Sequence, residues 1–222
     1  MTTTLHVPDP AWEARLARCP LAGTALFGSR TIAELLGLLT LHPGRRFGAR
    51  DAVFQLGTNL ESTQRAFERL CQAGLVSEVR SGRRRDFVMP HCTGTMALRQ
   101  LALETVTVAP RLRWAAEELG GGAVVAAFIH GSVAAGTETD TSDVDVIVAG
   151  EATISDLAPY VADLEHLMGR PVNPLCFVPS AYAAGARAPD GFLRRVVDRP
   201  RLLVGMGDDW LITAERSAHR AA

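Results

Sequence analysis

The chain has 222 residues, a formal net charge of −1 and a hydrophobic content of 47%. A chain of this length and apolar content can bury one core or two small ones, so we expect two domains. The sequence has no apolar run of about eighteen residues and no basic segment followed by an apolar one, which argues against membrane insertion and secretion. The four cysteines lack a C-x-x-C spacing, so we expect reduced thiols in a cytoplasmic protein rather than a metal-ligand set.

Basic charge is concentrated in the middle of the chain. Residues 45–89 contain nine arginines and five acids, whereas residues 90–222 contain eleven arginines and sixteen acids. The sequence contains no lysine. The permanent positive charge for any bound phosphate must therefore come from arginine side chains, with backbone N–H groups as further donors.

Residues 1–28 are expected to be a weakly ordered lead-in. They contain Pro8, Pro10 and Pro20 among small residues, and only Trp12 and Leu16 would anchor a short helix.

Three helices are expected after this lead-in. Apolar residues at helical spacing over 32–39 end at the sequence His-Pro-Gly of 42–44, and a second short helix follows at 49–56. Thr58-Asn59-Leu60-Glu61 has the pattern of a capping box and would start a third helix that ends at Gly74. The expected buried side of the third helix contains Leu60, Thr63, Phe67, Leu70 and Cys71.

A β-hairpin with a basic tip is expected next. Its strands would be residues 75–79 and 87–89, joined by a turn at Ser81-Gly82. The arginines around the tip are Arg80, Arg83, Arg84 and Arg85.

Three helices followed by a basic hairpin resemble a winged helix-turn-helix domain. The segment FERLCQAGLV at 67–76 is similar to helix endings of small bacterial repressors, and the resemblance covers residues 29–89. It implies double-stranded DNA as the partner, with the third helix in the major groove and the arginines of the hairpin, or wing, along the phosphate backbone. Affinity would then fall steeply with salt. The implied contacts from the third helix are Asn59, Ser62, Gln64 and Arg65, with Arg69 at a flanking phosphate. The alternative is that these residues form an ordinary solvated helix face and that the arginines belong to a soluble turn.

A connecting helix is expected over residues 90–120. Apolar residues recur at helical spacing from Leu98 to Leu112, and Pro110 would either kink this helix or begin a second one. The three glycines at 120–122 would end the helix before the next domain.

Two apolar runs in residues 123–149 carry the chemistry-bearing side chains. The first run, at 123–129, has the character of a buried strand and stops at Gly131-Ser132. A glycine there lets backbone N–H groups approach an anion, and Ser132 could start a short helix that favours negative charge at its N-terminus. The second run opens on Asp143 and Asp145, which lie two residues apart and therefore share one face of a strand. Two adjacent carboxylates suit Mg²⁺ accompanied by substrate phosphates.

This arrangement resembles the signature of the nucleotidyltransferase superfamily that includes DNA polymerase β, in particular its small bacterial and archaeal members. The resemblance implies that Gly131 and Ser132 bind the phosphates of a nucleoside triphosphate and that Asp143 and Asp145 hold Mg²⁺ in a catalytic role. It also implies a third carboxylate on a later strand, but the corresponding position in the run at 171–179 is Asn173, a poor general base and a weaker metal ligand. The alternative is a solvated loop-to-strand pair of aspartates.

The remaining elements would complete a mixed α/β sheet domain at residues 121–222. An amphipathic helix at 154–168 would cover the sheet, a helix at 192–197 would expose Arg194 and Arg195, and 201–204 would be a last strand. Either arginine could meet a triphosphate. Asp208-Asp209 is expected to be a charged turn before a C-terminal helix, and the alternative is that it supplies the missing carboxylate.

The expected fold class is therefore α+β, with an N-terminal winged helix-turn-helix domain and a C-terminal nucleotidyltransferase-like domain. Three functions are compatible with it. The favoured one is a DNA-binding transcriptional regulator that binds Mg²⁺ and a nucleoside triphosphate as ligand or substrate, acting as a homodimer by analogy with other repressors. The second is an active nucleotidyltransferase that transfers a nucleoside monophosphate to a hydroxyl of a protein, an RNA or a small molecule. The third is a degenerate domain used for protein contacts.

Overall fold

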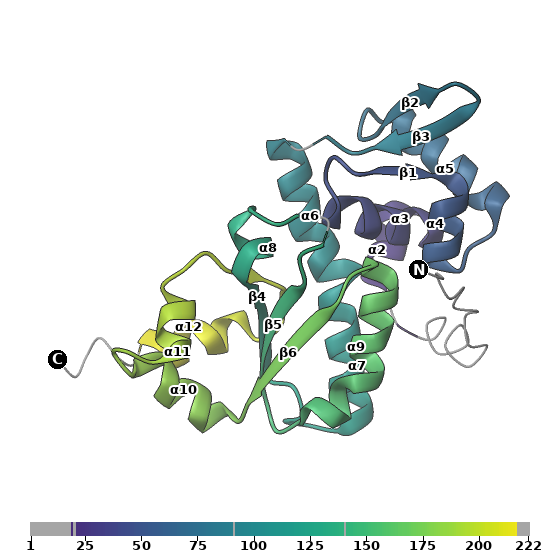
Figure 1. Cartoon of the computed structure of the whole chain (residues 1–222). Coiled ribbons are helices and arrows are strands. Elements are labelled where there is room, and N and C mark those ends of the chain that lie inside the picture. Colours follow the sequence, from purple (N-terminus) through teal and green to yellow (C-terminus); the bar gives the residue numbers. More distant parts are fainter. Residues whose placement is uncertain (1–18, 20, 91, 140, 217–222) are drawn as a thin grey trace, which may run out of the picture.

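The structure is a computed structural model of the chain that describes residue 19 and residues 21–90, 92–139 and 141–216 (Figure 1). It combines helices with two separate β-sheets, as expected for an α+β protein. The anchors expected in the lead-in, Trp12 and Leu16, lie outside the described residues. Within the described ranges, no helix is both long enough and apolar enough to cross a bilayer.

Helices and one small sheet make up the N-terminal half. Its sheet is antiparallel with the order β1-β3-β2, and β2 and β3 form a hairpin. The helices predicted over 32–39 and at 49–56 are confirmed, but β1 was not predicted because three residues are too few to show an alternating pattern. The elements are α2 (Ala22–Phe27), α3 (Arg30–Leu41), β1 (Arg46–Gly48), α4 (Ala49–Leu56), α5 (Leu60–Gln72), β2 (Ser77–Ser81) and β3 (Arg84–Val88).

The start of α5 differs from the expected capping box. The N-cap residue is Asn59, whose Oδ1 accepts a hydrogen bond of 2.8 Å from the backbone N–H of Ser62, whereas the Thr58 hydroxyl pairs with the Thr63 hydroxyl. This shift moves the helix start by one residue. Leu60, expected to be buried, is the first helical residue and is 38% exposed, while Thr63, Phe67 and Leu70 are buried as expected.

Part of the expected lead-in is ordered. Residues 22–27 form α2, which ends at Gly28 in the left-handed conformation. Gly23 lies so close to the end of helix α6 (Thr93–Thr105) that a Cβ at this position would be 2.6 Å from Cγ2 of Val106, the residue that follows this helix. A small residue at this point therefore lets α2 pack tightly, a signal that apolar periodicity does not detect.

The connecting segment is two helices, α6 (Thr93–Thr105) and α7 (Val108–Leu119), with Pro110 in the first turn of the second. Pro110 therefore begins a helix, one of the two expected outcomes. Both helices contribute to a core: Leu103 of α6 and Leu112 and Trp114 of α7 belong to the apolar cluster beneath the second sheet.

The second sheet has four strands in the order β6-β5-β4-β7. β5 and β6 run parallel, and β4 pairs antiparallel with both β5 and β7. Helices α7 and α9 cover one face, and α10, α11 and α12 lie on the other (Figure 1). The elements are β4 (Ala126–His130), α8 (Gly131–Ala135), β5 (Val144–Ala149), α9 (Ile154–Met168), β6 (Val172–Phe177), α10 (Pro179–Arg187), α11 (Phe192–Val197), β7 (Leu202–Leu203) and α12 (Asp208–Arg216).

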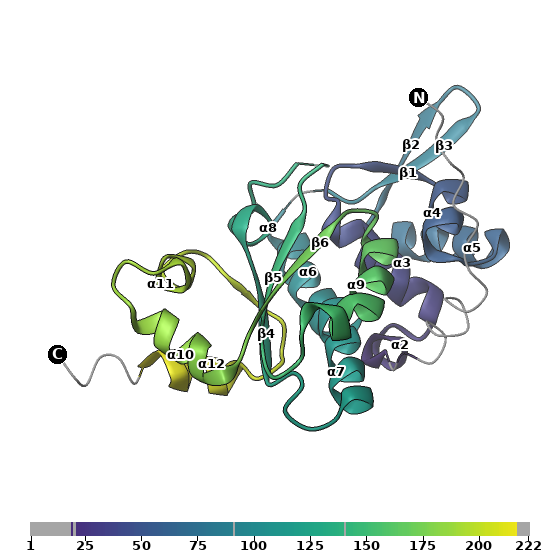
Figure 2. The ribbon, with the colours of Figure 1, turned by 60° about the horizontal axis from the view of Figure 1, so that its bottom comes forward.

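At the junction, each half contributes a side chain to the hydrophobic core of the other half. Leu41 of α3 packs in the cluster beneath the four-stranded sheet, and Leu167 of α9 packs in the cluster of the N-terminal helices. Buried polar groups also cross the junction: the His42 ring contacts the Met168 carbonyl and the Arg170 guanidinium, and Gln55 donates to the His166 carbonyl. As a result α3, α4 and α9 lie side by side, with β6 next to α9 (Figure 2).

Candidate functional site

The two aspartates lie at the start of β5, an inner strand of the sheet. Val144, Val146 and Val148 are buried against α7 and α9, whereas Asp143 is exposed and Asp145 is half-buried. The alternation expected from the sequence is therefore present at the start of β5. The strand itself explains this placement, because successive side chains point to opposite faces.

Asn173 lies directly beside Asp145 in the parallel pairing of β5 and β6. Its side-chain amide donates a hydrogen bond of 2.5 Å to Oδ2 of Asp143 and a longer one of 3.5 Å to Oδ1 of Asp145. The position where the sequence suggested a third carboxylate thus carries an N–H donor that both carboxylates share.

Gly131 approaches Asp145 more closely than any other residue type could. Its φ angle is +74°, and a Cβ built on it would lie 2.6 Å from Oδ2 of Asp145. Both features select glycine, because an L side chain is strained at this φ angle and would also collide with the carboxylate. The pairing of β4 with β5, which sets His130 opposite Asp145, brings the two segments together. The backbone of Gly131 and the carboxylate of Asp145 therefore lie next to each other.

The donor set of this site fits Mg²⁺. The carboxylates of Asp143 and Asp145 both accept from the amide nitrogen of Asn173, whose hydrogens carry partial positive charge. A cation could be shared by the same two carboxylates. Within the described ranges, no three His, Cys, Asp or Glu residues gather as a metal-ligand group. Two carboxylates nevertheless suit a magnesium ion whose other ligands are water and substrate phosphates.

His130 borders the site at the end of β4. Burial lowers its pKa from the ordinary histidine value, and the nearby Asp145 carboxylate opposes this effect. Its Nε2 atom is buried and has no hydrogen-bond partner in the part of the chain that the structure describes. The ring packs edge-on against Phe192 of α11, with 6.2 Å between the ring centroids.

A buried ion pair holds the loop that leads to Asp143. Nη1 of Arg99, on α6, lies 2.6 Å from Oε1 of Glu138, and both side chains are almost fully buried. The loop also contains a local turn in which Ser142 Oγ accepts from the Thr139 N–H at 2.9 Å. The loop that precedes Asp143 is therefore attached to α6 through this ion pair.

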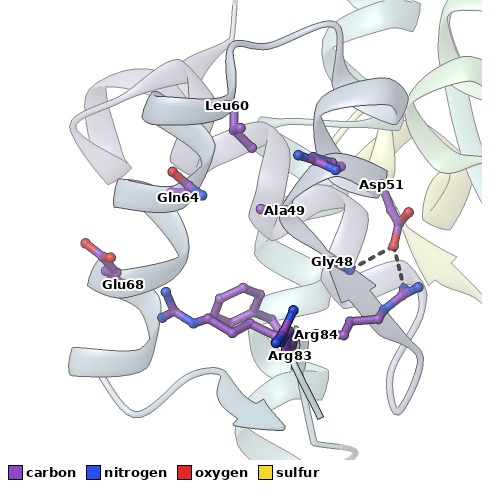
Figure 3. A pocket seen from close by; sticks show the side chains of 11 residues that line it. Gly48, Ala49, Asp51, Leu60, Gln64, Glu68, Arg83 and Arg84 are labelled. Carbon is purple, nitrogen blue, oxygen red and sulfur yellow. Dashed lines mark hydrogen bonds and ion pairs between the residues drawn. The ribbon is translucent and has the colours of Figure 1, made fainter. Parts of the chain in front are cut away.

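A second concave surface lies in the N-terminal half. This groove has a volume of about 590 Å³ and is bounded by one face of α5, by the β2–β3 hairpin and by the first turn of α4 (Figure 3). Its walls are formed by Gly48, Ala49, Arg50, Asp51, Leu60, Gln64, Glu68, Arg83, Arg84, Arg85 and Phe87.

Most hairpin arginines are paired with acids. Glu78 accepts from both Arg80 and Arg85 at 2.6 and 2.7 Å, and these two hydrogen bonds lower the pKa of Glu78 to about 2. Arg84 contacts Asp86 and Asp51, at 2.6 and 2.9 Å, which raises its own pKa (Figure 3). Arg83 makes no ion pair within the described residues and lines the groove. The arginine side chains of these pairs are exposed, so the pairs with Glu78 and Asp51 are expected to be weak, whereas the Asp86 carboxylate is buried.

Most of the other predicted DNA contacts do not line the groove. Of the predicted helix residues only Gln64 lines it; Asn59 caps α5, Arg65 pairs with Glu61 at 3.2 Å, and Ser62 and Arg69 lie elsewhere on the helix. Sequence reasoning missed the wall residues Leu60 and Glu68, which share a face with Gln64 at a spacing of four. It also missed Arg50 at the start of α4, although its place in a basic stretch was a usable signal.

The arginines and acids of the C-terminal helices also differ in their surroundings. Arg194 forms two hydrogen bonds with Asp198, at 2.8 and 2.6 Å, whereas Arg195 lines a small cavity beside Gly131. Asp208 and Asp209 are the first residues of α12 rather than a turn before it. Burial raises the pKa of Asp208. Gly207, the residue before it, lies against Val125 and Ala126 at the start of β4, whereas Asp145 lies opposite His130 at the end of that strand, so Asp208 is not part of the Asp143 cluster.

Comparison with known families identifies the domain that carries the aspartates. A family model described as "Nucleotidyltransferase domain" matches residues 110–177, from α7 to β6, and this range contains Gly131, Ser132, Asp143, Asp145 and Asn173. The chain therefore contains a nucleotidyltransferase domain, a class of domain that generally uses a nucleoside triphosphate and Mg²⁺. No curated protein matches the chain, and no solved structure does.

Proposed function

We propose that the protein is a DNA-binding transcriptional regulator whose nucleotidyltransferase domain binds a nucleoside triphosphate with Mg²⁺. The observation that carries the DNA-binding part is the groove in which Gln64 of α5 and three hairpin arginines, Arg83 to Arg85, face one space (Figure 3). Helices α3, α4 and α5 followed by the β2–β3 hairpin have the order of a winged helix-turn-helix domain, which supports this proposal.

In this proposal α5 enters the major groove and the hairpin lies along the phosphate backbone. Gln64 is exposed and can donate to and accept from base edges, while Arg83 is free of ion pairs within the described residues and is suited to a phosphate. Glu68 in the same groove would repel phosphate, so the closest DNA contacts should lie toward the hairpin and the first turn of α4 rather than at the end of α5.

Salt dependence tests the DNA-binding part. We expect the triple variant Arg83→Ala/Arg84→Ala/Arg85→Ala to weaken binding to a labelled mixed-sequence duplex and to lower the salt slope by about 1 for each phosphate that the hairpin no longer touches. The charge-matched control is Arg194→Ala/Arg195→Ala/Arg199→Ala, which removes three arginines near α11, on the opposite side of the molecule (Figure 1). Equal slopes for the wild-type protein and the hairpin variant would show that the hairpin does not contact phosphate.

The nucleotide part of the proposal assigns roles at the Gly131–Asp145 contact. The backbone of Gly131 and the Ser132 hydroxyl would bind phosphate oxygens, and Asp143 and Asp145 would hold Mg²⁺, which neutralises charge on the phosphates. Calorimetric titration with ATP, GTP, CTP and UTP in Mg²⁺, repeated on Asp143→Ala, tests these roles. Binding that disappears in the variant supports them, and the absence of binding to the wild-type protein would refute them.

The junction between the halves supports coupling between nucleotide and DNA. Strand β6, which carries Asn173, follows Met168 and Arg170, and both of these contact His42 at the end of α3. A nucleotide changes operator affinity only if it binds the DNA-free and DNA-bound states differently. Fluorescence polarisation with and without Mg²⁺ and each nucleoside triphosphate measures this coupling, and DNA affinity that ignores all of them would rule it out. Homodimerisation on paired half-sites and a cytoplasmic location are part of the same proposal, and sedimentation with and without duplex DNA tests the former.

The second candidate function is catalytic transfer of a nucleoside monophosphate to a hydroxyl group, with pyrophosphate leaving. The family match and the exposed position of Asp143 favour it. Asn173 opposes an efficient reaction, because its amide cannot accept the hydroxyl proton as a carboxylate would. Pyrophosphate release that disappears in Asp143→Ala would support this candidate, whereas release unchanged in the variant would exclude this site as its source.

A further inference from the structure

A small cavity adjoins the Gly131-Ser132 turn, and Gly131 is one of its lining residues. It has a volume of about 210 Å³ and lies between the end of β4 and α11, lined by His130, Gly131, Phe192, Arg195, Val196 and Arg199. We infer that this cavity binds the terminal phosphates of the nucleoside triphosphate. The inference rests on the nucleotide binding proposed above and assigns the part of the ligand that Arg195 and Arg199 recognise.

The charge of the cavity is positive and uncompensated. Its lining contains two arginines and no acid. Arg195 donates to the backbone carbonyl of Asp190 at 2.6 Å, which leaves its charge without a counter-ion, and Arg199 has no ion pair among the described residues. Arg194 on the same helix is instead neutralised by two hydrogen bonds to Asp198. The three arginines of this segment thus divide into one that is paired outside the cavity and two that line it.

His130, which also lines the cavity, has an unused hydrogen-bonding atom. Nε2 of His130 is buried and lacks a partner among the described residues, although a buried polar atom normally has one. Phe192, 45% exposed, closes the adjacent wall with its ring near that of His130. A phosphate oxygen in the cavity would give Nε2 a partner, and its negative charge would be attracted by the two arginines that line the same cavity.

Gly131 connects the cavity to the aspartates. Its backbone lines the cavity, and the position of its missing Cβ lies 2.6 Å from Oδ2 of Asp145. A chain of phosphates that passes Gly131 can therefore contact the carboxylate site at one end and the cavity at the other. The cavity is smaller than the roughly 300 Å³ at which sites for whole drug-sized ligands begin, so it suits the end of a nucleotide rather than all of it. Guanidinium groups provide the paired N–H donors that phosphate oxygens accept.

The test compares nucleotides of different phosphate length on matched variants of the full chain. Calorimetric titrations with ATP, ADP, AMP and inorganic tripolyphosphate in Mg²⁺ are made on the wild-type protein, Arg195→Ala/Arg199→Ala, Arg195→Lys/Arg199→Lys and the control Arg194→Ala. If GTP, CTP or UTP binds more tightly than ATP, the triphosphate, diphosphate and monophosphate of that nucleoside replace those of adenosine. We expect the double alanine variant to bind ATP and tripolyphosphate about tenfold more weakly, since two charged donors are removed, while AMP binding is unchanged. Arg194→Ala should match the wild-type protein, and the lysine variant should recover part of the affinity because it keeps both charges.

The outcomes separate this inference from the proposed function. ATP binding that is abolished in Asp143→Ala but unchanged in Arg195→Ala/Arg199→Ala would overturn the inference and leave the nucleotide site in place. Equal weakening of AMP and ATP in the double variant would also overturn it, because the cavity would then contact the nucleoside or its first phosphate. If the wild-type protein binds none of the four nucleoside triphosphates, both the inference and the proposed nucleotide site are refuted. Circular dichroism of each variant confirms that weaker binding does not reflect unfolding.

Discussion

The amide of Asn173 donates to the carboxylate of Asp143 across the parallel pair β5 and β6, at 2.5 Å. A neutral donor therefore stabilises a carboxylate at the place where a further acid would add negative charge. This contact makes the pair of aspartates tolerable without a cation and at the same time removes a group that could accept a proton.

Asn173→Asp should make the site more dependent on Mg²⁺. Three neighbouring carboxylates repel one another, so we expect tighter Mg²⁺ binding and lower stability in its absence. Calorimetry with Mg²⁺ and thermal unfolding with and without the ion measure both effects. Asn173→Ala is the control, because it removes the hydrogen bond without adding charge. Magnesium affinity equal to that of the wild-type protein would show that position 173 does not face the metal site. Pyrophosphate release that appears only in Asn173→Asp would identify the missing acid as the limit on catalysis.

Gly131→Ala should weaken nucleotide binding at least tenfold and cost about 1–3 kcal/mol of stability. The new Cβ would be strained at φ +74° and would displace the Asp145 carboxylate. Gly136→Ala is a matched control, because Gly136 has a φ angle of +69° but nothing within 4 Å of a built Cβ. Titration with Mg²⁺ and nucleotide, together with urea unfolding, separates the backbone strain that both variants share from the collision that only the first has. Equal weakening of binding in the two variants would mean that contact with Asp145 is unimportant.

Arg99→Met should destabilise the protein by about 3–5 kcal/mol, because it leaves the Glu138 carboxylate buried without a counter-ion. The double variant Arg99→Met/Glu138→Leu should recover much of this stability, since it removes both charges. Urea unfolding of the two single variants and the double variant gives the coupling free energy. If the loss of unfolding free energy in the double variant equals the sum of the losses in the single variants, the two side chains are not coupled and the ion pair does not stabilise the loop.

Glu78→Gln should strengthen DNA binding and steepen its salt dependence. The variant weakens the hold on Arg80 and Arg85, so that both become available to phosphate. Polarisation titrations at several salt concentrations measure the change. Glu117→Gln, on the exposed face of α7, is the control for the change in net charge. A Glu78→Gln variant with the affinity of this control would argue against hairpin contacts with DNA.

The same carboxylate predicts a pH effect on the hairpin. Because Arg85 and Arg80 lower the folded-state pKa of Glu78 to about 2 from an ordinary value of 4.5, the folded protein binds fewer protons than the unfolded chain in this window. Its stabilising contribution is therefore present above pH 4.5 and disappears as the pH falls toward 2. Urea unfolding between about pH 3 and pH 7 should show a smaller decrease of stability in acid for Glu78→Gln than for the wild-type protein, and parallel curves would contradict the assignment.

The sequence predicted those elements whose patterns are local. The helices at 49–56, 154–168 and 192–197 have the expected bounds, and the alternation of Val144, Asp145 and Val146 gave the correct faces of β5. Strand β1 was missed because it is short and is held by pairing with β3, a partner so far along the chain that no local pattern reveals it.

The candidate site was predicted in composition but not in its contacts. Spacing placed Asp143 and Asp145 on one face, and the position of Asn173 followed from the next apolar run. The collision that fixes glycine at 131, the ion pair of Arg99 with Glu138 and the difference between Arg194 and Arg195 all depend on side chains brought together by the tertiary fold. Such contacts leave no periodic trace in the sequence.

The exchange of Leu41 and Leu167 between the two cores has a consequence for how the protein unfolds. Each half contributes an apolar side chain to the interior of the other, so separating the halves would expose both cores to water. Unfolding should therefore be a single cooperative transition, and a ligand that binds either half should raise the melting temperature of the whole chain. Binding of a nucleotide to the C-terminal half should therefore also stabilise the N-terminal helices, which do not contact the nucleotide.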